Sequence, residues 1–148
     1  MLILGKDCKQ VIVYAEPNKD LRNVIMLGHE TFFPDLEAKF FENKTECVSY
    51  LHSFNEPILS TLDKRDCLLA IVLNHWFTDG WGNDILEEFA RKSEFSNIPF
   101  YLFYSKEEPL LKHTPGKLAL KNGARAYVFK EQGSKLFKVL RREIYGRK

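Results

Sequence analysis

The sequence lacks the marks of a secreted, membrane-bound or metal-binding protein. Its three cysteines, Cys8, Cys47 and Cys67, are odd in number and widely spaced, which predicts no disulfide framework and favours a reducing compartment. The four histidines show no HxxxH or HExxH spacing, so a zinc site is not expected. No apolar run approaches the roughly 18 residues that span a bilayer, and the beginning, MLILGKDCK, has too short an apolar run for a signal peptide. We therefore expect a cytoplasmic protein that uses no membrane, metal or cofactor.

Neither sign of charge dominates the chain. The formal net charge of +2 gives no argument for binding nucleic acid. A content of 45% hydrophobic and 28% charged residues is typical of a globular protein, and 148 residues fit one domain that can bury a core. We expect a single domain over residues 1–148, with its core at about residues 11–145.

Short apolar segments alternate with helix-compatible segments. The pattern predicts strands at residues 11–15, 36–41, 67–73, 98–104 and 126–129, and helices at 19–31, 44–54, 83–92, 117–121 and 134–145. Asn18 and Ser134 stand at helix N-cap positions, and Asn122-Gly123 at a helix end. Residues 67–73, CLLAIVL, lack polar alternation, as a central parallel strand covered on both faces does. This order predicts an α/β protein with a flavodoxin-like (βα)5 doubly wound parallel sheet, strand order 2-1-3-4-5.

In such a sheet the functional site lies at the carboxyl ends of the strands, beside the point where the strand order reverses. Polar and aromatic residues follow the predicted strands there. The residues that this edge would gather are Ala15, Glu16, Asn74, Tyr104, Ser105 and Lys130.

Four segments at these strand ends resemble a known family. They are VIVYAEPN, AIVLNHWFTDGWG, IPFYLFYS and GARAYVFKE. Their order and spacing, including the eight residues from Asn74 to Gly82, are similar to those of the response-regulator receiver domains, the CheY-like family. The GAxxYxxK pattern of that family falls on Gly123, Ala124, Tyr127 and Lys130. The resemblance covers residues 11–144 and leaves no room for an appended output domain.

The resemblance implies a phosphoryl-transfer site, but the reactive positions differ. A receiver accepts a phosphoryl group from a histidine kinase on an Asp carboxylate, beside Mg²⁺ held by acidic residues. Here the acceptor position carries Asn74, whose amide cannot form the acyl phosphate. The acidic pair is reduced to Ala15 and Glu16, so Glu16 is the only weak metal candidate. Tyr104 occupies the Thr/Ser position, and Lys130 alone is retained.

These losses predict a degenerate pseudo-receiver that is not an enzyme and signals by protein–protein contact. The resemblance implies a histidine kinase or another signalling protein as its partner, and no nucleic acid. The alternative is a small-molecule sensor, whose vacated pocket would bind an anionic or planar ligand. A flavodoxin-type carrier is not favoured, because EPNKD lacks a phosphate-cradling loop.

Several further residues have two interpretations each. Lys130 is expected to pair with Glu16, with ligand binding as the alternative. Tyr127, the switch position, is expected in a fixed rotamer, and Arg125 near the family's interaction face. Asp79-Gly80 is expected to form a turn. The aromatic residues around it, among them Trp76 and Trp81, would form a protein interface or cap the depleted pocket.

Overall fold

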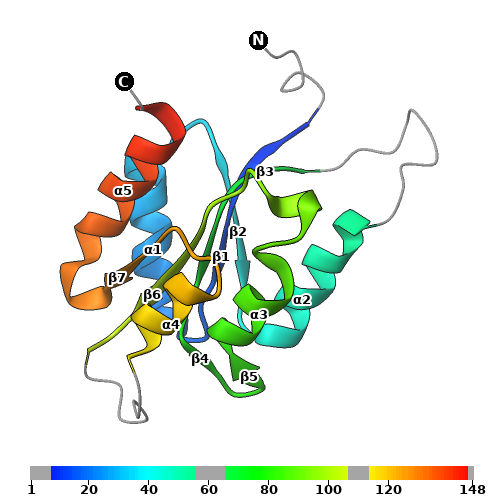
Figure 1. Ribbon diagram of the computed structural model, residues 1–148. Helices are drawn as coiled ribbons and strands as arrows, with labels where there is room; N and C mark the ends of the chain where they lie inside the picture. Colours follow the sequence, from blue (N-terminus) through cyan, green and yellow to red (C-terminus); the bar gives the residue numbers. More distant parts are fainter. Residues whose placement is uncertain (1–7, 56–65, 107–113, 147–148) are drawn as a thin grey trace.

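The computed structural model describes residues 8–55, 66–106 and 114–146. At its centre is a five-stranded sheet in the order β2-β1-β3-β6-β7, and all four strand pairings are parallel (Figure 1). This is the predicted flavodoxin-like order 2-1-3-4-5, because β6 and β7 are the fourth and fifth strands of this sheet along the chain. The strands are β1 Gln10–Ala15, β2 Glu37–Phe41, β3 Cys67–Leu73, β6 Phe100–Tyr104 and β7 Ala126–Phe129.

The helices follow the predicted order, with shifted ends. They are α1 Lys19–Phe32, α2 Lys44–His52, α3 Gly82–Phe89, α4 Pro115–Lys121 and α5 Gly133–Tyr145, with short 3-10 turns at η2 Ser53–Asn55, η3 Ser93–Phe95 and η4 Lys130–Gln132. Asn18 caps α1 as predicted, because its side chain accepts from the Leu21 backbone N–H at 2.9 Å. The cap predicted at Ser134 is wrong: the preceding η4 turn runs into α5, which begins at Gly133 without a side-chain cap.

Helices cover both faces of the sheet, so its central strands are apolar throughout. In Figure 1, α1 and α5 lie on one face and α2, α3 and α4 on the other. Successive residues of β1 alternate between the two cores: Val11 and Val13 pack with the α2–α4 layer, and Ile12 and Tyr14 with the α1–α5 layer. The absence of polar alternation in β3 therefore reflects burial on both faces, as predicted.

The prediction for the cysteines is wrong, because Cys8 and Cys67 form a disulfide. The sheet brings them together: Gln10 of β1 is in register with Cys67 of β3, and the Cys67 N–H donates to the Lys9 carbonyl at 2.7 Å. The two Cα atoms are 5.7 Å apart, although 59 positions separate them in the sequence. Spacing along the chain did not reveal this pair, since the strands become neighbours only in the fold. In the described part of the chain, no helix is both long and apolar enough to span a bilayer.

A buried histidine joins three segments of the α1–α5 layer. His29 of α1 is 2% exposed, and its Nδ1 lies 2.8 Å from the hydroxyl of Tyr14 on β1. Its Nε2 lies 2.8 Å from the Leu36 carbonyl, which precedes β2. This carbonyl can only accept, so Nε2 carries the proton and Nδ1 accepts from the tyrosine. Burial lowers the pKa of His29, because the charged ring would lose its hydration.

We predict that this histidine makes the protein less stable in mild acid. The unfolded chain takes up a proton at His29 near pH 6.5, whereas the folded protein does so only at lower pH. The contribution of His29 to the free energy of unfolding is therefore complete above about pH 6.5 and decreases as the pH is lowered below that value. Urea unfolding between pH 7.5 and pH 5 measures this slope. A His29→Gln variant is expected to be less stable by about 1–3 kcal/mol at neutral pH and to show a flatter pH dependence.

The matched control is Tyr14→Phe, because it removes the hydroxyl 2.8 Å from His29 Nδ1 and keeps the buried histidine. It is expected to lose stability but to retain a pH dependence. An unchanged slope in His29→Gln would contradict this account.

Candidate functional site

The carboxyl ends of β1 and β3 lie side by side. The Asn74 backbone N–H donates to the Ala15 carbonyl at 2.9 Å, and the Glu16 N–H donates to the Phe41 carbonyl at 2.9 Å. The strand ends thus place Glu16 and Asn74 at one edge of the sheet, and β7 brings Lys130 to the same edge. The sequence analysis predicted this grouping, and the structure brings these three residues together.

Lys130 joins Glu16 to Asn74 in a closed polar group. Its Nζ lies 2.6 Å from Asn74 Oδ1 and 3.0 Å from Glu16 Oε1, so the expected ion pair with Glu16 is present. Asn74 Nδ2 donates to the Trp76 carbonyl at 2.5 Å, and Glu16 Oε2 accepts from the Asn18 N–H at 3.2 Å. The Glu16 side chain is only 3% exposed and that of Lys130 17%, so the pair is largely shielded from water.

The charges of this group cancel. One ammonium meets one carboxylate, and the third member is a neutral amide. With a second carboxylate at position 74, the buried edge would carry an excess negative charge that burial makes costly. An asparagine there removes both the nucleophile and the excess charge. Within this group, one ammonium thus compensates one carboxylate.

The donors present do not fit a Mg²⁺ site. Mg²⁺ prefers six oxygen ligands in octahedral geometry, but the only carboxylate of this group, on Glu16, is paired with Lys130. Position 15 carries the methyl group of Ala15, which is 2% exposed. Among the described residues, no group of three or more His, Cys, Asp or Glu could hold a metal ion.

Tyr104 is buried and its hydroxyl is directed to α4. The side chain is 1% exposed, and its hydroxyl accepts from the Gly116 N–H at 3.1 Å. Its ring lies 5.8 Å from that of His75 and 5.3 Å from that of Phe129, centroid to centroid. A side chain that fills this space leaves little room for a phosphoryl group there.

Tyr127 lies in the same aromatic cluster. Its ring centroid is 6.3 Å from that of Tyr104, and the side chain is half-buried. A Cβ at Gly116 would stand 2.5 Å from Tyr127 Cγ, so a glycine is required for this close contact with α4. This packing restricts the ring, although the fixed rotamer expected at this switch position stays a prediction.

Ser105 forms a hydrogen bond with Glu131 of the η4 turn. Its hydroxyl donates to Glu131 Oε2 at 2.6 Å, and the Lys106 N–H donates to Glu131 Oε1 at 3.1 Å. These bonds, first that from Ser105, lower the pKa of Glu131. Glu131 stands where the receiver pattern has a proline, and it ties the end of β6 to the η4 turn instead. The sequence analysis did not identify this contact.

A short hairpin follows Asn74 and was also not predicted. β4 (Trp76–Phe77) pairs antiparallel with β5 (Gly80–Trp81), so the turn between them is at Thr78 and Asp79, one position before the turn expected at Asp79-Gly80. The DG pair in FTDGW indicated a chain reversal between aromatic residues, although Gly80 belongs to β5 and not to the turn. Gly82 closes the hairpin, because a Cβ there would stand 2.1 Å from the Asn74 carbonyl oxygen.

The hairpin is bound to the N-terminus of α2 through Asp79. Its carboxylate accepts from the backbone N–H groups of Lys44 and Thr45, both at 2.9 Å, and from the Thr45 hydroxyl at 2.6 Å. Burial of the carboxylate raises its pKa slightly, but these hydrogen bonds outweigh that effect and lower the pKa of Asp79 to about 2. Residue 79 therefore replaces water at the first N–H groups of the helix.

The aromatic residues of the hairpin divide into two sets. Phe77 is 1% and His75 8% exposed, so these two rings cover the core beneath them. Trp76 and Trp81 are 37% and 39% exposed and stand opposite each other in the hairpin register. The buried rings of His75 and Phe77 thus cap the core, whereas the interface expected at Trp76 and Trp81 stays a prediction.

Arg125 belongs to a different part of the surface. It precedes β7 and forms an ion pair with Glu143 of α5 at 2.7 Å. The structure thus places it beside α5, away from the Lys130 group.

Comparisons with known proteins agree with this architecture. No protein-family model and no curated protein matches the sequence. Among solved structures, the receiver domain of the DNA-binding response regulator MerR from Colwellia psychrerythraea 34H is similar, with a TM-score of 0.71, 16% identity, and coverage of 90% of this chain and 97% of that one.

Two further receiver domains are similar. That from Clostridium thermocellum has a TM-score of 0.67 and 18% identity, covering 91% of this chain and 94% of its own. That from Rhodospirillum rubrum has a TM-score of 0.66 and 18% identity, covering 89% of each chain. At these identities the likeness shows the fold: the chain has the flavodoxin-like fold of response-regulator receiver domains.

We predict that Asp79→Ala destabilises the protein. The change removes the acceptor for two backbone N–H groups at the start of α2, and loss of such a cap costs about 1–2 kcal/mol. Urea unfolding at neutral pH measures the effect. The stabilisation is present above pH 3.8, the ordinary pKa of the carboxyl, and is lost as the pH falls towards about 2.

Thr78→Ala is the matched control, because it alters the neighbouring, exposed turn residue and keeps the Asp79 carboxylate. Equal unfolding midpoints for the two variants would contradict a capping role for Asp79.

Proposed function

We propose that this protein is an atypical response-regulator receiver domain that signals by protein–protein contact, without phosphorylation at position 74. The observation that carries the proposal is the bond from Lys130 Nζ to Asn74 Oδ1 at 2.6 Å. In a working site, as the family resemblance implies, the lysine would hold a phosphoryl oxygen. Here it holds an amide oxygen of the residue at the acceptor position.

The chemistry of the site supports this role. An amide nitrogen is a poor nucleophile, and Asn74 Nδ2 also donates to the Trp76 carbonyl. Lys130 also forms an ion pair with Glu16, so the carboxylate that could bind a metal ion is already paired. Tyr104 places a buried ring where a small hydroxyl residue would stand. Each of these features opposes phosphoryl transfer by a separate cause.

The exposed hairpin supplies the surface for a protein partner. Tryptophan contributes a large apolar area with few rotatable bonds, and it is enriched among residues that dominate binding energy. Trp76 and Trp81 are held by the hairpin, which Asp79 fixes to α2, so little freedom would be lost on binding. We propose a histidine kinase or another signalling protein as the partner.

The alternative of a small-molecule sensor has less support. Its ligand would have to enter the space beside Lys130, where the ammonium is already bonded to Asn74 and Glu16. The neighbouring Tyr104 ring is buried and its hydroxyl is bonded to α4. A screen of anionic and planar ligands for a rise in Tm would identify such a ligand.

We predict that the wild-type protein takes no phosphoryl group from acetyl phosphate and Mg²⁺. Intact mass measured without acid treatment is expected to show the unmodified protein only, because the amide at position 74 offers no carboxylate. An acid-labile adduct of one phosphoryl group on the wild type would overturn the proposal.

The matched control is Ala15→Asp combined with Asn74→Asp, which restores two carboxylates on the same backbone. A working receiver domain tested in parallel verifies the reagent. If the double variant becomes phosphorylated and the wild type does not, the difference is assigned to these two positions.

We also predict that the two tryptophans control partner binding. Trp76→Ser combined with Trp81→Ser is expected to weaken cross-linked capture of the cellular partner by at least about tenfold, as loss of dominant interface residues does. The partner is identified by mass spectrometry and its affinity is then measured with purified proteins.

Val24→Ser combined with Leu27→Ser is the control, because these side chains of α1 are 60% and 66% exposed but lie on the other face of the sheet. Equal affinity for both double variants and the wild type would contradict the assignment of the hairpin as the interface.

A further inference from the structure

The disulfide lies at the opposite end of the sheet from the Lys130 group. Cys8 precedes β1 and Cys67 begins β3, whereas Glu16 and Asn74 follow the other ends of the same strands. In Figure 1 the amino ends of these strands are at the top and the β4–β5 hairpin is at the bottom. This cross-link has no part in the proposed signalling site and requires a separate explanation.

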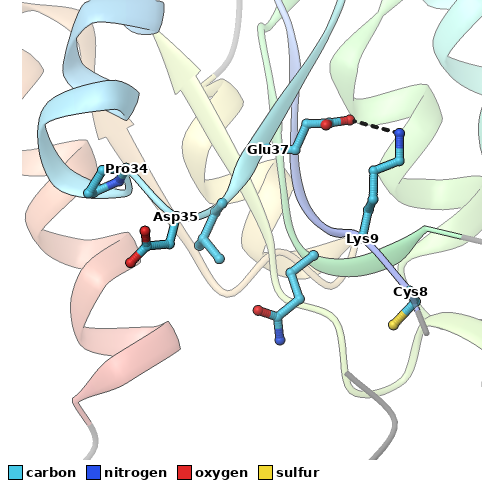
Figure 2. Close-up of a pocket in the computed structure, with 7 residues that line it drawn as sticks. Cys8, Lys9, Pro34, Asp35 and Glu37 are labelled. Atoms are coloured by element: carbon cyan, nitrogen blue, oxygen red, sulfur yellow. Dashed lines mark hydrogen bonds and ion pairs between the residues drawn. The ribbon is translucent and has the colours of Figure 1, made fainter. Parts of the chain in front are cut away.

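A cavity lies beside one cysteine of the pair. Its volume is about 420 Å³, and Cys8 lines it together with residues that precede and begin β1 and β2 (Figure 2). Cys67 is not among the lining residues. Both cysteines are half-buried, but only Cys8 lines this cavity, so a small molecule bound there meets Cys8 first.

The cavity has charged groups of both signs. Lys9 and Glu37 form an ion pair across 3.4 Å, and both side chains are well exposed, at 65% and 45%. Asp35 also lines the cavity. Exposed pairs of this kind exchange partners at little cost, so a ligand with carboxylate and ammonium groups can be accommodated beside Cys8.

From this placement we infer that the Cys8–Cys67 disulfide is a reversible modification site, at which a small aliphatic thiol of the amino-acid or peptide class attacks Cys8. The inference is independent of the proposed signalling function.

The exchange balances in two steps. The thiolate of the small molecule attacks Cys8 Sγ, the bond between the two cysteines breaks, and its electron pair goes to Cys67 Sγ, which takes up a proton. The product is a mixed disulfide at Cys8. A second small thiol then attacks the mixed disulfide, leaving Cys8 as a thiol and releasing the oxidised small-molecule disulfide. The protein gains two electrons and two protons, and two small thiols are oxidised.

The third cysteine does not take part. Cys47 of α2 is 0% exposed, and burial raises the pKa of its thiol to about 12. The reactive form of cysteine is the thiolate, so a buried neutral thiol is inert. Modification is therefore confined to the Cys8–Cys67 pair.

Reduction is expected to loosen the protein without unfolding it. The disulfide closes a long loop that contains β1, α1, β2 and α2, and such a cross-link stabilises by restricting the unfolded chain. The strands remain joined by their own hydrogen bonds, including that from Cys67 to Lys9. We expect reduction to lower Tm by roughly 10 °C.

The test is a titration of the wild-type protein in glutathione buffers of graded ratio, quenched with N-ethylmaleimide and followed by intact mass and peptide mapping. The expected result is one glutathione on Cys8 at intermediate ratios and two labelled thiols, Cys8 and Cys67, at reducing ratios. Cys47 is expected to stay unlabelled in the folded protein.

Variants separate the possible outcomes. Cys47→Ser is expected to behave as the wild type, and Cys67→Ser to take one glutathione on Cys8 from oxidised glutathione. Cys8→Ser is expected to take none, or far less. The inference is overturned if the pair resists reduced glutathione in the native state, if the adduct forms on Cys67, or if both thiols are free after exposure to air.

Discussion

The balance of one ammonium against one carboxylate and one amide organises the candidate site. Lys130 follows β7, Glu16 follows β1 and Asn74 follows β3, so a single side chain joins the ends of three strands. Because Glu16 is almost completely buried, its charge requires a partner, and removing that partner would leave an uncompensated charge in the interior. Lys130 thus stabilises the contact between these strand ends, and this structural role supports the proposal that it does not bind a phosphoryl group.

The hydrogen bonds of this site continue into the β4–β5 hairpin. Asn74 holds Trp76 by its side-chain amide, and the hairpin closes at Gly82, whose missing side chain leaves space for the Asn74 carbonyl. Asp79 attaches the turn to α2. The loop after the acceptor position is thus held at its beginning, tip and end. A surface held in this way suits the proposed role, in which the two tryptophans are presented to a partner in a constant arrangement.

The sequence predicted the fold and much of the site, because both depend on apolar periodicity and on strand ends. β3 and β7 were predicted with their observed limits, and Glu16, Asn74 and Lys130 meet as expected. The disulfide, the Ser105–Glu131 contact and the hairpin were missed for different reasons. The disulfide and the Ser105–Glu131 contact join residues that become neighbours only when strands pair. Residue patterns within a single segment of the sequence therefore cannot predict them. The hairpin did have a local signal, but two-residue strands fall below the length at which alternation can be recognised.

The disulfide and the Lys130 group lie at opposite ends of β1 and β3, and the strands between them decide whether a change at one end affects the other. Between the disulfide and the Lys130 group, Val11, Ile12 and Val13 of β1 and their partners on β3 are apolar. Tyr14 ends this run, and its hydroxyl bonds to His29 of α1, which in turn bonds to the Leu36 carbonyl. A close-packed core passes on displacement, but these strands are held on both sides, by β2 and by β6. Breaking the disulfide removes a restriction on the unfolded chain and leaves the pairing of the folded strands in place. Its oxidation state would therefore be expressed in the free energy of unfolding, while the hairpin surface at the other end stays the same.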